Sequence, residues 1–432
     1  MASALLPTQR LGGLPRTAVI WCIALAVATV PLGTGRTRYG FDPGRGYSLT
    51  LWVGLVDIML LLSLAFGFRA TLHRVRARQT APLIEGSILL LAGLVVSSLI
   101  HPVDRGIAIV LRLAGAIVVA DWVASADRNL LRTVGKIIAT LAVGEWCLSL
   151  FQLATKGPLG LWFLGERSDP FFRWGETGET IAPTGTFIHS YLLAGFLAAA
   201  MSVVVVLAFL GLSTKPTAFV VTGVASSAAL LTYSRVSVLS VFLMLAVLGL
   251  LTIKATTRRL AAGLILWSLL VSTVTFSLTL DGWNMKKARS DAGGITSGRV
   301  ELLQENLQVV RKHPFFGTGT GRYTMSLLDE GQDLGPIPRP PHMVPMAALA
   351  EAGILSVPGM LLQGFAALLL VLRRRWVALL PLASLLSPLM LEQFMWNTPE
   401  GMMMVALGFG AASLAQTWRS SEERTELHVG AT

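Results

Sequence analysis

The stretch from Phe187 to Leu212 reads FIHSYLLAGFLAAAMSVVVVLAFLGL and contains no Asp, Glu, Lys or Arg. About 20 consecutive apolar residues in helical conformation are enough to cross a bilayer, so this stretch predicts a transmembrane helix. Similar runs recur through the 432 residues, of which 53% are hydrophobic and only 14% charged. A soluble domain carries roughly a quarter charged residues. We therefore expect an all-α polytopic membrane protein.

About twelve apolar runs are candidates for transmembrane helices. They are Thr17 to Gly33, Leu49 to Phe68, Pro82 to Ile100, Gly106 to Val123, Ile137 to Leu153, Phe187 to Leu212, Ala218 to Leu231, Val236 to Ile253, Leu260 to Leu280, Met343 to Leu372, Val377 to Leu391 and Met402 to Leu414. No linker divides them, which predicts a single polytopic membrane domain over residues 1–418 and a polar cytoplasmic tail at 419–432.

The net charge of +11 is better explained by membrane topology than by nucleic-acid binding. With the N-terminus inside, every short inner segment is basic, and Arg373-Arg374-Arg375 is the clearest example. This is the positive-inside pattern of membrane proteins. The same topology places Thr34 to Ser48, Lys156 to Thr186 and Asp281 to His342 outside. The last segment is long and basic, which indicates an anionic ligand on the outer side.

The sequence predicts neither a disulfide framework nor a metal site. Cys22 and Cys147 both lie in apolar runs, and the six histidines are scattered. Some ionisable residues lie within or beside the predicted spans, where they are either functional or paired internally, because unpaired charge is costly in the membrane. These residues are Asp57, Glu85, Arg112, Asp121, Glu145 and Glu351.

The turn Leu231-Thr232-Tyr233-Ser234-Arg235 joins two apolar runs with almost no loop. In the predicted topology it lies at the outer surface. A guanidinium fixed there suits a phosphate group, because its planar fork donates two parallel hydrogen bonds. The alternative is that Arg235 only extends toward the lipid headgroups.

The outer segment SGRVELLQENLQVVRKHPFFGTGTGRYT, from Ser297 to Thr324, predicts an amphipathic helix. One apolar helical face is formed by Val300, Leu303, Leu307 and Val310. Ser297 is a plausible N-cap and Pro314 ends the helix, which leaves Arg299 in the first turn. A helix dipole disfavours a cation there unless an anion also binds. Arg299 is therefore either an anion ligand or simply exposed to solvent.

Two further features follow this helix. Gly317, Gly319 and Gly321 form a GxGxG pattern that follows a helix and a proline, so a tight turn is a better interpretation than a nucleotide site. His342 follows a proline-rich stretch and begins the next apolar run. A histidine at that position is either a base near neutral pH or a residue that only caps the helix entry.

These motifs resemble the O-antigen ligase and polymerase superfamily. Thr232-Tyr233-Ser234-Arg235 looks like that family's T-x-S-R turn. Arg299 together with the residues from Pro314 to Gly319 is similar to its R…P-[LF]-F-G-x-G signature. The stretch from His342 to Gly353 is similar to its H-N…E-x-G stretch, although Met343 stands where Asn is common.

The resemblance implies a metal-independent, inverting glycosyltransferase of cell-envelope polysaccharide biosynthesis, with no cofactor. Such an enzyme takes a glycan from an undecaprenyl-pyrophosphate carrier at the outer face of the cytoplasmic (inner) membrane. A ligase passes it to a lipid or protein acceptor, and a polymerase to another carrier-linked glycan. The resemblance implies that Arg235 and Arg299, with Arg322 third, bind the pyrophosphate, and that His342 is the catalytic base.

The sequence is also compatible with two other classes of membrane protein. A lipid-glycan or ion-coupled transporter is compatible with about twelve spans and with intramembrane charges. Carriers commonly show repeated halves and interrupted helices, however, and no half-repeat stands out here. A cell-wall glycan polymerase of the shape, elongation and division type is also a polytopic enzyme that uses lipid-linked sugars.

Overall fold

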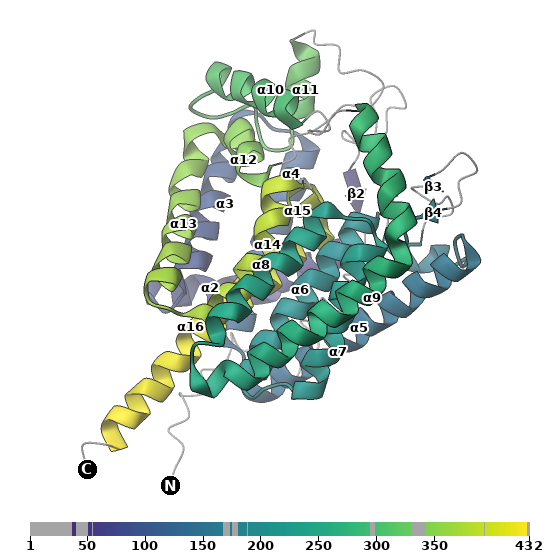
Figure 1. Cartoon of the computed structure of the whole chain (residues 1–432). Coiled ribbons are helices and arrows are strands. Elements are labelled where there is room, and N and C mark those ends of the chain that lie inside the picture. Colours follow the sequence, from purple (N-terminus) through teal and green to yellow (C-terminus); the bar gives the residue numbers. More distant parts are fainter. Residues whose placement is uncertain are drawn as a thin grey trace.

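The computed structural model describes residues 37–39, 51–53, 55–166, 173–174, 180–187, 189–293, 299–330, 343–392 and 394–429. For residues 37–39, 51–53, 163, 173–174, 180, 285–293, 299–301, 394, 397 and 419–429 it describes the backbone alone. Most of the described chain is helical (Figure 1).

The long helices are α2 (Leu55–Arg76), α3 (Pro82–Ile100), α4 (Asp104–Ser125), α5 (Arg128–Thr155), α6 (Ser190–Phe209), α7 (Lys215–Leu231), α8 (Arg235–Leu251), α9 (Ala255–Gly293), α13 (Val357–Leu372), α14 (Trp376–Leu391) and α16 (Pro399–Val429). The shorter elements are η2 (Trp162–Leu164), α10 (Arg299–Lys312), α11 (Tyr323–Asp329), α12 (Val344–Ala352), η3 (Gly353–Ser356) and α15 (Phe394–Asn397). Two small antiparallel ribbons pair β1 (Thr37–Tyr39) with β2 (Leu51–Val53), and β3 (Arg173–Trp174) with β4 (Thr180–Ile181).

The expected all-α polytopic class is confirmed, but the count of twelve spans is not. Among the described residues, seven helical segments are long and apolar enough to cross a membrane, and one of them joins α12, η3 and α13. The helices α7, α8 and α14 are apolar but shorter. The first predicted span, Thr17 to Gly33, lies outside the described residues. The predicted tail at 419–432 is helical up to Val429, as the end of α16.

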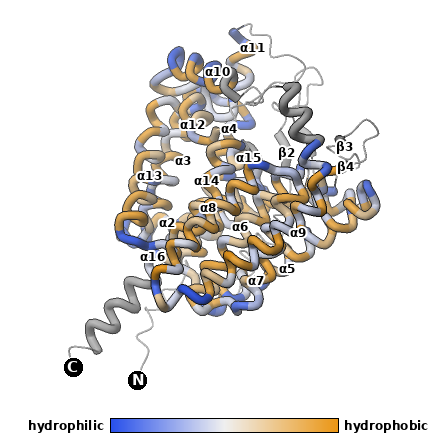
Figure 2. Tube along the Cα trace, in the orientation of Figure 1, coloured by the Kyte–Doolittle hydropathy of each residue, from blue (hydrophilic) through white to orange (hydrophobic). Residues whose placement is uncertain are grey.

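The helices form one bundle with two distinct ends. At one end, α10 and α11 lie over α12, whereas α16 projects from the other end (Figure 1). Polar residues concentrate toward the two ends, with apolar helices between them (Figure 2). Because α12 begins beside α10, the Arg373-Arg374-Arg375 turn after α13 falls at the opposite end. The basic turn and the α10–α11 cover are therefore on opposite sides of the bundle, as the predicted topology requires.

The core is centred on α6. Of the apolar window of α6, 89% is buried inside the protein, against 22% for α9. The α6 helix packs against α5, α7, α14 and α16, and its Ala-rich sequence lets these helices approach closely. The α9 helix instead packs on one side, against α7 and α8, and leaves apolar residues such as Leu278 exposed. An exposed apolar helix face in a bundle of this kind is a lipid-facing surface.

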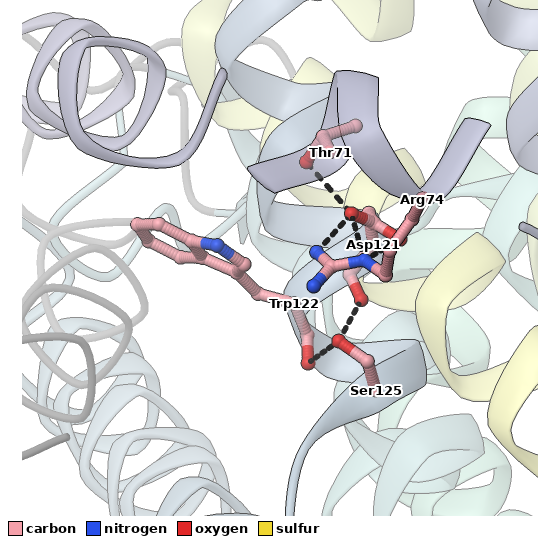
Figure 3. Close-up of polar contacts among 5 residues, drawn as sticks. All are labelled: Thr71, Arg74, Asp121, Trp122 and Ser125. Carbon is pink, nitrogen blue, oxygen red and sulfur yellow. Dashed lines mark hydrogen bonds and ion pairs between the residues drawn. The ribbon is translucent and has the colours of Figure 1, made fainter. Parts of the chain in front are cut away.

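Four charged residues inside the bundle form two ion pairs. Figure 3 shows the Arg74 guanidinium of α2 against the Asp121 carboxylate of α4, with Nε to Oδ2 at 2.9 Å. Thr71 donates to the same carboxylate at 2.7 Å. Deeper between the same helices, Arg112 Nε donates to Asp57 Oδ1 at 2.5 Å. Both ion pairs join α2 to α4, so an internal structural role accounts for these four groups.

Candidate active site

The turn between α7 and α8 is closed by its own side chains. Thr232 follows α7, and its Oγ1 donates to the carbonyl oxygen of Ala228 at 2.8 Å. Ser234 is the N-cap of α8, and its Oγ accepts the backbone N–H of Ser237 at 3.2 Å. Such caps satisfy backbone groups that a helix end leaves unpaired. The new helix therefore begins directly at Arg235, and the tight connection expected from the sequence is confirmed.

Tyr233 anchors this turn to neighbouring elements. Its φ of 52° lies in the left-handed region, which is uncommon for a residue with a side chain. Its ring is buried, packs against Ala182 and lies 5.6 Å from the Trp283 ring of α9. The hydroxyl lies so close to Gly282 that a Cβ there would overlap it. Burial, together with the charge of Asp281, raises the pKa of Tyr233.

Arg235 begins α8 with its side chain at the surface of the protein. The side chain is exposed, and among the described residues it has no hydrogen-bond or ion-pair partner. It occupies the first position of α8, where the helix dipole favours an anion and disfavours a cation. The placement of Arg235 is thus explained if an external anion binds here.

The cover, which we define as residues 299–330, is hydrogen-bonded to α12 through its glycine-rich turn. The N–H of Thr318 donates to the Ala350 carbonyl oxygen at 2.9 Å, and the N–H of Gly319 donates to that of Glu351 at 3.1 Å. Gly317 has a φ of 67°, and a Cβ at this position would overlap the backbone of Glu351. The GxGxG pattern is therefore a close-packed turn, as the sequence interpretation held.

Glu351 joins the cover to three other elements. It is buried in α12, and its carboxylate accepts the indole N–H of Trp396 at 3.0 Å and the backbone N–H of Gly321. Arg105, at the start of α4, is close enough for an electrostatic interaction with this carboxylate. The carbonyl oxygen of Glu351 accepts from Ser97 Oγ of α3 at 2.6 Å. One residue thus links the cover, α3, α4 and α15.

The structure describes the other predicted site residues to different extents. Arg322 precedes α11, and its Nη2 donates to Asp329 Oδ2 at 3.1 Å, so part of its charge is already used within the cover. Arg299 is the first residue of α10, where only its backbone is described. His342 lies outside the described residues and directly precedes Met343, the N-cap of α12.

The apolar face predicted for α10 is partly buried, with Val310 packed against the cluster around Tyr323. The predicted stripe was Val300, Leu303, Leu307 and Val310. In the structure, the residues buried against the bundle are Leu302, Asn306 and Val309. Leu303 and Leu307 are 36% and 41% exposed. The helix carries two adjacent stripes, and periodicity alone does not decide which one packs.

Residues 218–362 match the sequence model of the family described as O-antigen ligase. This match supports membership of the O-antigen ligase superfamily. The matched range contains the Arg235 turn, the cover, and the helices from α12 into α13. The match supports an O-antigen ligase-like, glycosyltransferase-like function in general. Together with the apolar helices, it supports a multi-pass membrane protein. A comparison with curated proteins finds no match to this chain.

A polar network that the sequence reasoning missed lies beside the Arg235 turn. Glu145 of α5 accepts both the N–H and the hydroxyl of Thr186, at 2.9 and 2.6 Å. Gln152 accepts the N–H of Gly185 at 2.9 Å and donates to Glu166 at 2.7 Å. Glu145 stood out as a charge in an apolar run, but the uncharged Gln152 gave no such signal. The network fixes residues 184–186, next to the Ala182 surface that Tyr233 packs on.

Positive charge gathers around the glycine-rich turn. Partial burial and the nearby charges of Arg322 and His313 lower the pKa of His101. Lys312 hydrogen-bonds Glu330 at 2.5 Å and, with His313, holds the pKa of that carboxyl below its usual range. No group of three or more His, Cys, Asp or Glu side chains suited to a metal occurs among the described residues.

Proposed function

We propose that this protein transfers a glycan from an undecaprenyl-pyrophosphate carrier to an acceptor hydroxyl at the outer face of the cytoplasmic membrane. The observation that carries the proposal is Arg235, an exposed guanidinium without a partner among the described residues, fixed at a helix start within the O-antigen ligase match. The cover and the Arg235 turn belong to the same end of the bundle, and this end would face outward.

The chemistry follows from the leaving group. As the bond between the anomeric carbon and the pyrophosphate oxygen breaks, negative charge grows on that oxygen. A guanidinium held in place stabilises this charge more in the transition state than in the ground state. Arg235 would supply this stabilisation from α8 and Arg299 from the start of α10. Arg322 would contribute less, because it is paired with Asp329. Two or three fixed arginines can perform this role without a metal.

His342 would act on the acceptor. It directly precedes the N-cap of α12, at the end of the bundle that the cover occupies. An imidazole with an ordinary pKa can accept a proton near neutral pH. The acceptor oxygen would form its bond to the anomeric carbon from the side opposite the pyrophosphate and pass its proton to His342. One displacement of this kind inverts the anomeric centre.

The intramembrane charges, one of the two observations compatible with a transporter, have another explanation. The ionisable residues that drew attention in the sequence each have a polar partner inside the protein. Asp57 pairs with Arg112, and Asp121 with Arg74. Glu85 accepts from the hydroxyl of Thr80, Glu145 from Thr186 and Glu351 from Trp396. Internal pairing explains these charges without a transported ion.

The test is glycan transfer by the purified protein in liposomes, with an undecaprenyl-pyrophosphate glycan and candidate lipid or glycan acceptors. Arg235→Ala should reduce transfer at least about 100-fold, the usual scale for losing one preorganised charge stabiliser. Arg259→Ala is the matched control, because Arg259 is an exposed arginine at the opposite end of the bundle. Equal activity of Arg235→Ala and the wild-type protein would exclude the pyrophosphate assignment.

Two further variants test the remaining roles in the same assay. Arg299→Ala should resemble Arg235→Ala, and His342→Ala should lose transfer over the whole pH range. Full activity of His342→Ala across pH would remove it as the base. Product mass separates ligation, which adds one glycan to an acceptor, from polymerisation, which extends a carrier-linked glycan.

A further inference from the structure

An apolar patch is exposed where the cover meets the membrane helices. We define the cover patch as Phe315, Phe316 and Ile354, which are 66%, 46% and 56% exposed. Phe315 and Phe316 follow α10, and Ile354 lies in η3. Exposing several large apolar side chains together to water is unfavourable. The patch therefore indicates that another apolar surface covers these residues.

The hydrogen bonds fix the level of this patch along the bundle. The Phe316 carbonyl oxygen accepts from Ser97 Oγ at 2.8 Å, and the N–H of Ile354 donates to the Pro314 carbonyl oxygen at 2.8 Å. Ser97 lies three residues before the end of α3 at Ile100. At 1.5 Å per residue, α3 is about 28 Å long, close to the thickness of the bilayer core. The patch is thus about one helical turn from the end of a span, which is the level of the membrane interface.

The patch is continuous with surfaces that face lipid. On α3, Val96, Leu99 and Ile100 are 40%, 76% and 43% exposed, in the turn beside Ser97. On α13, Leu361 is 67% exposed, two turns beyond Ile354. Figure 2 shows α3, α12 and α13 as a predominantly hydrophobic side of the bundle that reaches up to α10.

The residues around the patch also suit an interface. Leu303 and Leu307 give α10 an exposed apolar stripe. Arg311 is exposed and has no hydrogen-bond or ion-pair partner among the described residues. Basic side chains next to an apolar stripe are typical of helices that lie in a membrane interface, with the cation among the headgroups.

We propose that the cover patch inserts into the outer interface of the lipid bilayer and seats the cover on the membrane. The partner is the lipid surface itself, at the boundary between headgroups and acyl chains. The cover is then held from two sides, by Glu351 inside the bundle and by lipid outside it. The proposal does not depend on which reaction the protein catalyses.

Fluorescence quenching tests the depth of the patch. In a chain carrying Cys22→Ser and Cys147→Ser, Phe315→Cys is labelled with an environment-sensitive fluorophore and placed in single-copy lipid nanodiscs. Leu361→Cys serves as the lipid-facing reference. Asp329→Cys serves as the aqueous reference, because the Asp329 side chain is 59% exposed on α11. Quenching by spin-labelled lipid is compared with quenching by iodide in the buffer.

The label at position 315 should show at least half of the lipid quenching seen at position 361, and much less iodide quenching than at position 329. Iodide quenching equal to that at position 329 would place the patch in water and overturn the proposal. A label shielded from both quenchers would also overturn it, because another protein segment would then cover the patch. Glycan transfer is not part of either readout.

Discussion

Replacing Glu351 with Ala should release the cover from the membrane helices. The Glu351 carboxylate accepts the Trp396 indole N–H and the Gly321 backbone N–H inside the protein. A buried donor that loses its acceptor costs about 1–3 kcal/mol, so two donors predict a loss of about 2–6 kcal/mol in the stability of this contact. Arg105 would also lose the nearby negative charge. Glu351→Gln keeps one acceptor oxygen and should lose about half as much.

Hydrogen–deuterium exchange of residues 317–321 measures this contact directly. When exchange follows local opening, each 1.4 kcal/mol corresponds to a tenfold change in rate, so Glu351→Ala should accelerate exchange at Gly321 by about 30-fold or more. Amides in the centre of α6 should not change. Glu330→Ala is the matched control, since this carboxylate pairs with Lys312 at the surface of the same cover, where such pairs contribute only about 0–1 kcal/mol.

The activity readout separates positioning from general stability. If Glu351 sets the position of the cover, Glu351→Ala should lower kcat for glycan transfer while the thermal unfolding of the whole bundle remains cooperative. Glu351→Gln should recover part of that kcat. Unchanged exchange at Gly321 in Glu351→Ala would refute the reasoning, because it would show that the carboxylate does not hold the turn.

Three further outcomes are expected. Tyr233→Ala should lower the stability of the purified protein by about 3–5 kcal/mol in denaturant titrations, because a buried aromatic ring is lost, and Tyr233→Phe should be much milder. Gln152→Leu should accelerate amide exchange at residues 184 and 185, whose N–H groups lose their acceptor, whereas Gln152→Glu should protect them better than Leu. The hydrogen bond from Lys312 lowers the pKa of Glu330, so this pairing stabilises the cover above the ordinary carboxyl pKa and is lost as pH falls through the lowered pKa of the folded protein. Exchange in α11, compared with the intrinsic rate at each pH, should therefore rise as the wild type is acidified through this range, and Glu330→Gln should show no such step.

Much of the architecture follows from local sequence. The run Pro82 to Ile100 coincides with α3 because a continuous apolar stretch with a proline at its start leaves few alternatives. The start of α8 at Arg235 was also predictable, since Thr232 and Ser234 cap the two adjoining helices. Local patterning thus placed Arg235, which is the part of the candidate site that is best described.

Contacts between distant residues were not predictable in the same way. Glu351 and Trp396 are 45 residues apart, and neither carries a pattern that names the other. Arg322 was a candidate phosphate ligand from its charge, whereas its pairing with Asp329 appears only in three dimensions. Which face of α10 is buried depends on α12, which follows later in the chain. Patterning identifies which groups are available, and packing decides which of them are used.

The ion pair between Asp57 and Arg112 has a consequence for how the chain is made. The two residues are 55 positions apart, and Asp57 is synthesised first. At about 5–20 residues per second, Asp57 waits roughly 3–11 s before Arg112 exists. A carboxylate inside the membrane is costly unless it is compensated, and Asp57 lies in the first turn of α2. The hydrogen bond from Arg112 can compensate it only after α4 has been made, so this contact between α2 and α4 forms after both helices have been synthesised.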